Sequence, residues 1–206
     1  MRIIVVRAAG HRAMPWRNGL GTTREIAVRP EAAPDRFAWR ASIATVDQAC
    51  AFSAFPGYDR IITVIDGNGM TLRIDGAEHR LDRRYVPFAF RGEAAVTCTP
   101  LDGAIHDLNI MVDRSRHEAS VVPLSVGGDG EVRNTRAVAI LVVCLGGSVH
   151  VRIGPDAPAV ALGRWDTAIG ESRTQRPTAC PVEIGAITGR SVVALVTIGP
   201  AAAERR

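Results

Sequence analysis

Lysine is absent from this sequence of 206 residues, and aromatic residues make up only 5% of it. All 25 basic residues are therefore arginines, and the formal net charge is +4. The arginines are spread along the chain, without a basic run or a ladder of aromatics that would stack on bases, so we expect no nucleic-acid partner. Each of these cations can still grip a carboxylate with two parallel N–H groups.

Long apolar runs are also missing. No stretch reaches the roughly 18 residues that a membrane-spanning helix needs, so we expect no membrane partner. The N-terminal segment MRIIVVRAAGHR has one charge before a very short apolar run, which predicts a first strand rather than a secretory leader. Hydrophobic residues nevertheless make up 47% of the chain, which indicates a globular protein.

The four cysteines stand far apart, at positions 50, 98, 144 and 180, and include no C-x-x-C pair. This spacing argues against a zinc site and against a disulfide framework. Cys98 and Cys144 lie in strand-like runs, where we expect small buried hydrophobic side chains. The cysteine usage favours a reducing cytoplasm.

Short runs rich in Val, Ile and Thr recur between Gly, Pro, Asp and Asn, whereas long amphipathic helical patterns are nearly absent. The pattern predicts an all-β protein of the sandwich or barrel type with short helical turns only, one of them near Ala44–Cys50. The expected strands are Arg2–Arg7, Arg24–Val28, Phe37–Val46, Ile61–Ile65, Gly69–Ile74, Glu78–Leu81, Val86–Phe90, Ala94–Thr99, Leu108–Val112, Ala137–Cys144, Ser148–Ile153, Val160–Leu162, Trp165–Ala168, Val182–Thr188 and Ser191–Thr197.

An internal echo indicates how the strands are organised. The segments Ile62–Ile74 (ITVIDGNGMTLRI) and Leu141–Ile153 (LVVCLGGSVHVRI) each read as a strand, a turn with glycine and a second alternating strand. At constant spacing Gly67 matches Gly146 and Met70 matches Val149, and one more strand follows in each copy, which favours duplication over chance. We therefore predict an N-terminal module (residues 1–118) with the ligand pocket and a C-terminal module (residues 119–206), joined by residues 119–135 in one compact unit.

The hairpin-and-strand arrangement resembles the cupin barrel, in which a metal is often held by an H-x-H pair, a glutamate and a later histidine. The position after the first glycine turn reads Met70-Thr71-Leu72-Arg73 instead. Metal-ligand spacing is absent, so we expect neither a metal nor another cofactor. The five histidines are His11, His79, His106, His117 and His150.

The segment Met14–Ile26 (MPWRNGLGTTREI) is the most unusual part of the chain. Its proline and two glycines prevent regular backbone, and it concentrates hydrogen-bonding side chains. Such a segment can form one wall of a pocket, although a capped turn followed by an exposed strand is an equal alternative on local chemistry alone. No Walker sequence follows the glycines.

Polar residues also occur in the middle of otherwise apolar strands. Phe37–Val46 alternates, with Trp39 on one face and Arg40 and Ser42 on the other, and an arginine there suits a lumen that holds an anion. Arg60 precedes a strand and is a second cation candidate. Asp107 and Asn109 share one face of a third strand. In each case an ordinary surface position is the alternative.

Nucleophile signatures are missing, since the chain has no G-x-S-x-G motif and no Cys–His–Asn set that spacing supports. Glu25 and Asp107 remain as candidates for proton transfer. We therefore expect binding rather than catalysis and leave the enzymatic alternative open.

The order and spacing of five motifs resemble the HutD/Ves family. They are MPWRNGLGTTREI, FAWRASIATV, FSAFPGYDRIITVIDGNGMTL, PFAFRG and DLNIMV, and together they cover about residues 14–112. The resemblance implies a bicupin without a metal, linked to histidine utilisation in bacteria. It also implies binding of a small carboxylate such as urocanate or formylglutamate, with modulation of the pathway rather than an established enzymatic activity.

Three hypotheses follow. The first is a small-anion binding protein, the second a metal-free cupin isomerase or hydrolase acting on an intermediate of histidine utilisation, and the third an interaction module that assembles through its sheets, in the simplest case as a homodimer. The candidate ligand-binding residues are Trp16, Asn18, Thr22, Arg24, Glu25, Trp39, Arg40, Ser42, Arg60, Phe90, Asp107 and Asn109.

Overall fold

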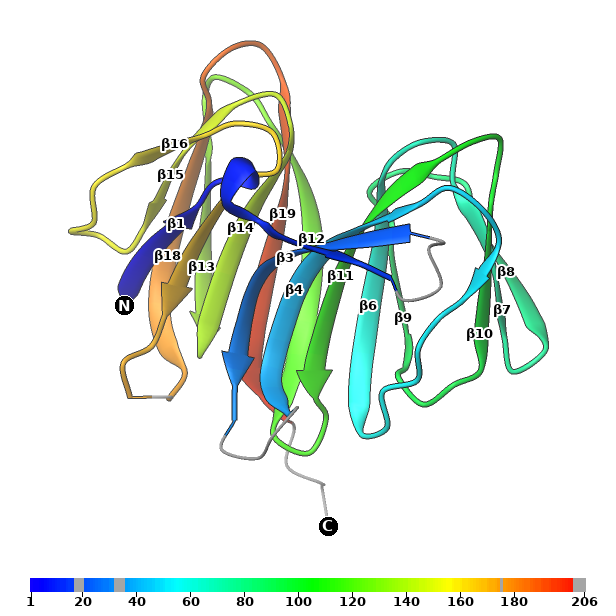
Figure 1. The fold of residues 1–206 in the computed structure, drawn as a ribbon. Coiled ribbons are helices and arrows are strands. Elements are labelled where there is room, and N and C mark those ends of the chain that lie inside the picture. The colour runs from blue at the N-terminus through cyan, green and yellow to red at the C-terminus, as the bar shows by residue number, and fades with distance from the viewer. Residues whose placement is uncertain (17–20, 32–35, 175, 202–206) are drawn as a thin grey trace. The chain divides into compact units, whose positions relative to one another are not determined.

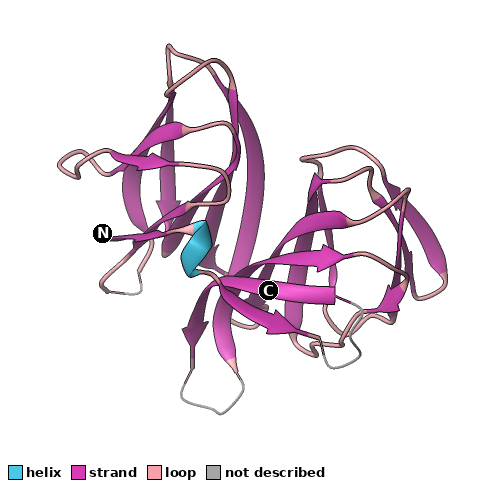
Figure 2. Cartoon of the chain, turned by 45° about the horizontal axis from the view of Figure 1, so that its top comes forward, coloured by secondary structure: helices cyan, strands magenta, loops and turns pink. Residues whose placement is uncertain are grey.

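A computed structural model describes residues 1–16, 21–31, 36–174 and 176–201, and nearly all of the regular secondary structure in them is β-strand (Figure 1; Figure 2). A 3-10 turn, η1 (Ala8–Gly10), is the one helical segment among them. In that described part, no helix has the length and the apolar character that crossing a membrane requires. The chain divides into two compact units, which we call the first unit (Arg12–Arg116) and the second unit (Met1–His11 with His117–Arg206).

The first unit contains two antiparallel sheets. One has the strand order β2-β3-β4-β11-β6-β9 and the other the order β5-β10-β7-β8. Its strands are β2 (Arg12–Pro15), β3 (Gly21–Pro30), β4 (Phe37–Val46), β5 (Cys50–Ala51), β6 (Tyr58–Asp66), β7 (Met70–Ile74), β8 (Ala77–Leu81), β9 (Pro87–Arg91), β10 (Val96–Pro100) and β11 (Ile105–Asp113). Ten buried side chains, among them Ile62, Val64, Met70 and Leu72, form a shared apolar cluster inside this unit.

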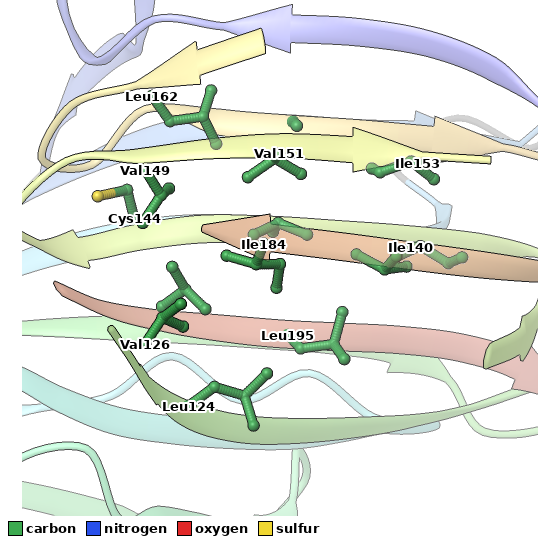
Figure 3. Close-up of a cluster of buried hydrophobic side chains, with 14 of the residues drawn as sticks. Leu124, Val126, Ile140, Cys144, Val149, Val151, Ile153, Leu162, Ile184 and Leu195 are labelled. Atoms are coloured by element: carbon green, nitrogen blue, oxygen red, sulfur yellow. The ribbon is translucent and has the colours of Figure 1, made fainter. Parts of the chain in front are cut away.

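The second unit is built in the same way, from sheets of order β1-β17-β14-β19-β12 and β13-β18-β15-β16. Its strands are β1 (Arg2–Val6), β12 (His117–Val126), β13 (Glu131–Ala137), β14 (Ala139–Gly146), β15 (Val149–Ile153), β16 (Val160–Leu162), β17 (Thr167–Glu171), β18 (Thr178–Ala186) and β19 (Ser191–Pro200). The side chains drawn in Figure 3 fill its interior. The buried cluster to which they belong is aliphatic, apart from the small thiols of Cys144 and Cys180.

The two units repeat one strand topology. The order β4-β11-β6-β9 in the first unit corresponds to β12-β19-β14-β17 in the second, and β5-β10-β7-β8 corresponds to β13-β18-β15-β16. Each strand of the first copy thus has its counterpart eight strands later in the numbering. This repeat agrees with the duplication expected from the sequence, and it gives the two-module β-barrel fold that we predicted.

The alignment of the two repeated segments, which matches Gly67 with Gly146, holds for the second strand of each hairpin. Met70 and Val149 are both fully buried, as are Leu72 and Val151, and all four lie in the interior clusters. The strand before the turn is offset by one residue, because Ile62 faces the interior whereas its aligned partner Leu141 is outside the corresponding cluster. A β-bulge between Cys144 and Gly146 interrupts the register of β14 at this point.

The unit boundaries differ from the expected division at residue 118. Strand β1 pairs with β17 from Arg2 opposite Glu171 to Val6 opposite Thr167, so the first eleven residues fall in the second unit. The sequence does reveal β1 as a strand. Its partner is not visible in the sequence because antiparallel pairing can join strands at any separation along the chain.

Two local expectations were wrong. The segment 119–135, expected as a connection, lies mostly in β12 and β13, and the helical turn expected near Ala44–Cys50 is replaced by the end of β4 and the short strand β5. In β12 the residues alternate between more and less exposed positions, which is the period of a strand. The polar residues and glycines of that segment concealed this period.

Replacing glycine in the hairpin turns tests the close packing of the first unit. Gly69 and Gly76 both have positive φ, but a Cβ on Gly69 would lie 2.4 Å from the carbonyl oxygen of Leu81, whereas Gly76 has open space around it. Gly76→Ala should cost about 1–2 kcal/mol of unfolding free energy from backbone strain alone. Gly69→Ala should cost clearly more in urea unfolding, and equal costs for the two variants would contradict this packing.

Candidate functional site

The polar candidates gather on the inner face of the six-stranded sheet of the first unit. Residues that are directly opposite in an antiparallel pair point to the same face. Asn109 on β11 lies opposite Ile62 on β6 and Ser42 on β4, and Ser42 lies opposite Glu25 on β3. Because Ile62 belongs to the interior cluster, Asn109, Ser42 and Glu25 face the interior as well.

Two neighbouring rows add charge to this face. In one row, Met111 on β11 lies opposite Arg40 on one side and Arg60 on the other. In the other row, Asp107 lies opposite Ala44 and Val64. The interior of the first unit therefore holds two arginines and two carboxylates on four adjacent strands.

Arg60 is held in a cage of phenylalanine rings. Its guanidinium carbon lies 5.1 Å from the ring centre of Phe52, 5.8 Å from that of Phe55 and 5.0 Å from that of Phe90. Such contacts attract a cation to the ring faces. The residue is only 5% exposed, and burial lowers its pKa to about 10, a shift that the charge of Asp107 opposes and that of Arg40 reinforces.

The guanidinium of Arg60 retains hydrogen-bonding capacity. Its Nε is buried without a hydrogen-bond partner, and its Nη1 donates one long bond of 3.4 Å to the carbonyl oxygen of Ser53. Because a guanidinium carries five N–H groups, this one long bond leaves part of its donor capacity unused among the described residues.

Asp107 is the complementary unsatisfied group. The residue is 1% exposed, and neither of its carboxylate oxygens has a hydrogen-bond partner. Burial raises its pKa to about 7, although the charge of Arg60 acts in the opposite direction. Two positions further along β11, the side-chain oxygen of Asn109 is also buried without a partner.

Arg40 and Glu25 engage each other across neighbouring strands. Nε of Arg40 lies 3.0 Å from Oε2 of Glu25, and both side chains are largely covered. The geometry is that of an ion pair without an aligned hydrogen bond, since Nε of Arg40 has no hydrogen-bond partner. Arg40 and Glu25 therefore partly neutralise each other through an ion pair. No such ion pair joins Arg60 and Asp107, both of which the structure describes.

The remaining candidates lie in different environments. Trp16 packs against the interior cluster and donates from Nε1 to Oγ1 of Thr23 over 2.8 Å, so Thr23 rather than Thr22 faces the interior on β3. Arg24 is exposed on the other face of β3. Trp39 is buried, but it alternates with Arg40 and faces away from the interior. Asn18 lies outside the described residues.

Sequence reasoning named Phe90 but missed the other two rings that surround Arg60. Phe52 and Phe55 come from the segment between β5 and β6, where no periodicity marks which face a side chain occupies. Composition carried a usable signal, because nine of the ten aromatic residues lie between Arg12 and Arg116. The sequence predicts a buried side chain at Cys98 and assigns nothing to Cys50. The two residues lie directly opposite each other on β10 and β5. Burial raises the pKa of both thiols, and the charge of Asp107 raises it further.

The described residues of the second unit form no comparable polar interior. At the positions that correspond to the polar rows, β19 presents Val193 and Leu195 and β12 presents Leu124 and Val126. A surface cleft on this unit is lined in part by charged residues. One of them, Glu131, forms an ion pair with Arg133. We place the candidate site in the first unit for this reason.

The described residues contain no group of three or more His, Cys, Asp or Glu side chains placed to hold a metal ion. His79, for example, lies against the ring of Phe88 at 5.0 Å. The polar groups on the inner face of the six-stranded sheet are guanidinium, carboxyl, amide and hydroxyl groups.

Solved structures identify the class of protein. The fold matches that of a cupin 2 conserved barrel protein from Leptotrichia buccalis with a TM-score of 0.55 at 13% identity, over 85% of this chain and 88% of that one. It matches AerE from Microcystis aeruginosa with a TM-score of 0.66 at 9% identity, over 91% and 97% of the two chains. The protein is thus cupin-like, with two barrel modules.

The family follows from the sequence. The HutD family model matches residues 8–185, and the chain belongs to this family, the one that its motifs resemble. HutD from Pseudomonas fluorescens SBW25, in a structure described as a formate condition, is 30% identical with a TM-score of 0.80 over 97% and 99% of the chains. A conserved protein of unknown function from Pseudomonas aeruginosa PAO1 is 35% identical, with a TM-score of 0.88 over 97% and 100%.

Curated relatives match over a shorter stretch. An uncharacterized 21.2 kDa protein in the hutC 3' region of Pseudomonas putida is 44% identical over 115 residues, which are 56% of this chain and 60% of that protein. Protein Ves from Citrobacter koseri is also 44% identical over 115 residues, 53% and 59% of the two chains. The aligned stretch thus spans about 60% of the length of these relatives.

The buried carboxyl group of Asp107 should make stability depend on pH. Its pKa is raised from 3.8 to about 7, so the stabilisation from its neutral form is complete below pH 4 and is lost as the pH rises to 7. Relative to Asp107→Asn, which cannot ionise, the wild-type protein should lose on the order of 4 kcal/mol of unfolding free energy over this range. Urea unfolding at a series of pH values measures the difference.

The matched control is Asp156→Asn, which removes the same charge from an exposed turn between β15 and β16. Its stability curve should run parallel to that of the wild type. Parallel curves for Asp107→Asn and the wild type would instead show that Asp107 does not titrate as a buried group.

Proposed function

We propose that this protein binds a small carboxylate in the interior of the first unit and modulates histidine utilisation through that binding. The observation that carries the proposal is Arg60, a cation buried among phenylalanine rings with an unpartnered Nε. The corresponding interior of the second unit is apolar, so the polar groups are a property of one copy and not of the fold.

Electrostatics favours an anion at this position. Burying a charged group without a partner costs free energy, and a buried polar group left unsatisfied costs about 1–3 kcal/mol. The charge of Arg40 acts on Arg60 in the same unfavourable direction as burial does. A carboxylate would relieve both effects, because it accepts two parallel N–H groups from one guanidinium.

The relatives suggest the source of the carboxylate. Their names connect them with HutD and with the hutC region, and the family resemblance points to an acid of histidine utilisation, of the urocanate or formylglutamate type. We place the protein in the cytoplasm, a proposal supported by four cysteines that are free and buried. Modulation would follow if the loaded and empty forms differ in stability or in their contacts with a partner.

Arg60→Met tests the proposal, because methionine fills similar space without a charge. Loss of charge-assisted hydrogen bonds costs about 1.5–3 kcal/mol, so the affinity for such an acid should fall at least tenfold in titration calorimetry. The control Arg73→Met removes an exposed arginine from β7 and should bind as the wild type does. If no acid of the panel raises the wild-type melting temperature at millimolar concentration, the proposal fails.

A metal-free enzyme is the second candidate, and one observation favours it. A carboxyl group with a pKa of about 7 can exchange a proton with a ligand at neutral pH, and Asp107 meets this condition inside the site. Glu25, the other proton-transfer candidate, is engaged with Arg40. Product formation that Asp107→Asn abolishes, with binding retained, would favour this function over binding alone.

A further inference from the structure

We infer that the ligand of this site carries an N–H donor group in addition to its carboxylate, and that Asp107 and Asn109 receive this donor and set the specificity. The inference rests on the proposed function and adds the second half of the ligand to it. It selects an imidazole-bearing or amino-bearing monocarboxylic acid over a dicarboxylic acid that lacks an exposed N–H.

The first step is the set of acceptors on β11. Both carboxylate oxygens of Asp107 and the side-chain oxygen of Asn109 are buried, inward-facing and without a hydrogen-bond partner. An ionised carboxylate can only accept hydrogen bonds, and a neutral carboxyl group adds a single O–H. At least two of the three oxygens therefore lack a donor in either protonation state, and the carboxylate of a ligand supplies none.

The second step is the separation of these acceptors from the cation. The charge of Arg60 acts on Asp107, yet no hydrogen bond joins the two residues. Arg60 instead lies among its three phenylalanine rings on the β6 side of the interior. The interior thus has a donor end at Arg60 and an acceptor end at Asp107, and a molecule with both kinds of group satisfies both ends.

The third step is discrimination. A second carboxylate placed at the acceptor end would face ionised Asp107 as a like charge, and in either protonation state of Asp107 it would bring no donor to the acceptors. A site built to receive an N–H rejects an analogue without it more strongly than a merely hydrophobic pocket would, because its own polar groups remain unpaired.

A matched pair of probes tests the inference. Imidazol-4-ylacetate and furan-3-ylacetate have similar shape and the same carboxylate, but only the first has an N–H donor. In titration calorimetry the wild-type protein should bind the imidazole acid at least tenfold more tightly. In Asp107→Leu, which removes both acceptor oxygens, the ratio should fall to about threefold or less while the furan acid still binds.

Controls separate this inference from the proposed function. Asp156→Asn should keep the wild-type ratio, and Arg60→Met should weaken both probes by a similar factor, because both share the carboxylate. Asp107→Asn serves as a second variant of near-identical shape, and circular dichroism confirms that each variant is folded.

Equal affinities of the two probes for the wild type, or a ratio that Asp107→Leu leaves unchanged, would overturn the inference and leave the proposed carboxylate site standing. Binding of neither probe at millimolar concentration would overturn both. A ratio that falls only in the Asp107 variants supports the assignment of the donor to this end of the site.

Discussion

The pairing of β11 with β4 on one side and β6 on the other fixes nearly everything about the candidate site. This double antiparallel register carries Asp107 and Asn109 inward, and it places Arg40 and Arg60 on either side of Met111. A slip of one residue would move all of these groups to the opposite face. The register of one central strand therefore decides whether the first unit has a polar interior at all.

The sequence predicted the all-β class, most strands and the repeated hairpin, because alternation and glycine turns are local signals. It placed Arg40, Ser42, Asp107 and Asn109 on shared faces by the same period. It did not separate Thr22 and Arg24 from their inward neighbours, and it did not find Phe52 and Phe55 around Arg60. Those positions depend on long-range register and on a segment without periodicity, neither of which a local pattern contains.

The two units show what duplication permits. Both keep the same strand order, and on the hairpin strand after the turn the first buries Met70 and Leu72 and the second Val149 and Val151. In the second unit the interior is packed with aliphatic groups, which suits stability (Figure 3). In the first unit the same architecture tolerates buried charges that cost stability, and real proteins accept such costs mainly at functional sites. The contrast within one chain is therefore the main reason for placing the candidate site in the first unit.

The pairing of β1 with β17 has a consequence for biosynthesis. Val6 leaves the ribosome long before Thr167, the residue it pairs with, and all the strands of the first unit are made in between. Since domains generally fold as units while the chain emerges, the first unit can fold before β17, the strand with which β1 pairs, has been made. The N-terminal strand can therefore join its sheet only after β17 has been made, so the second unit is completed later than the first.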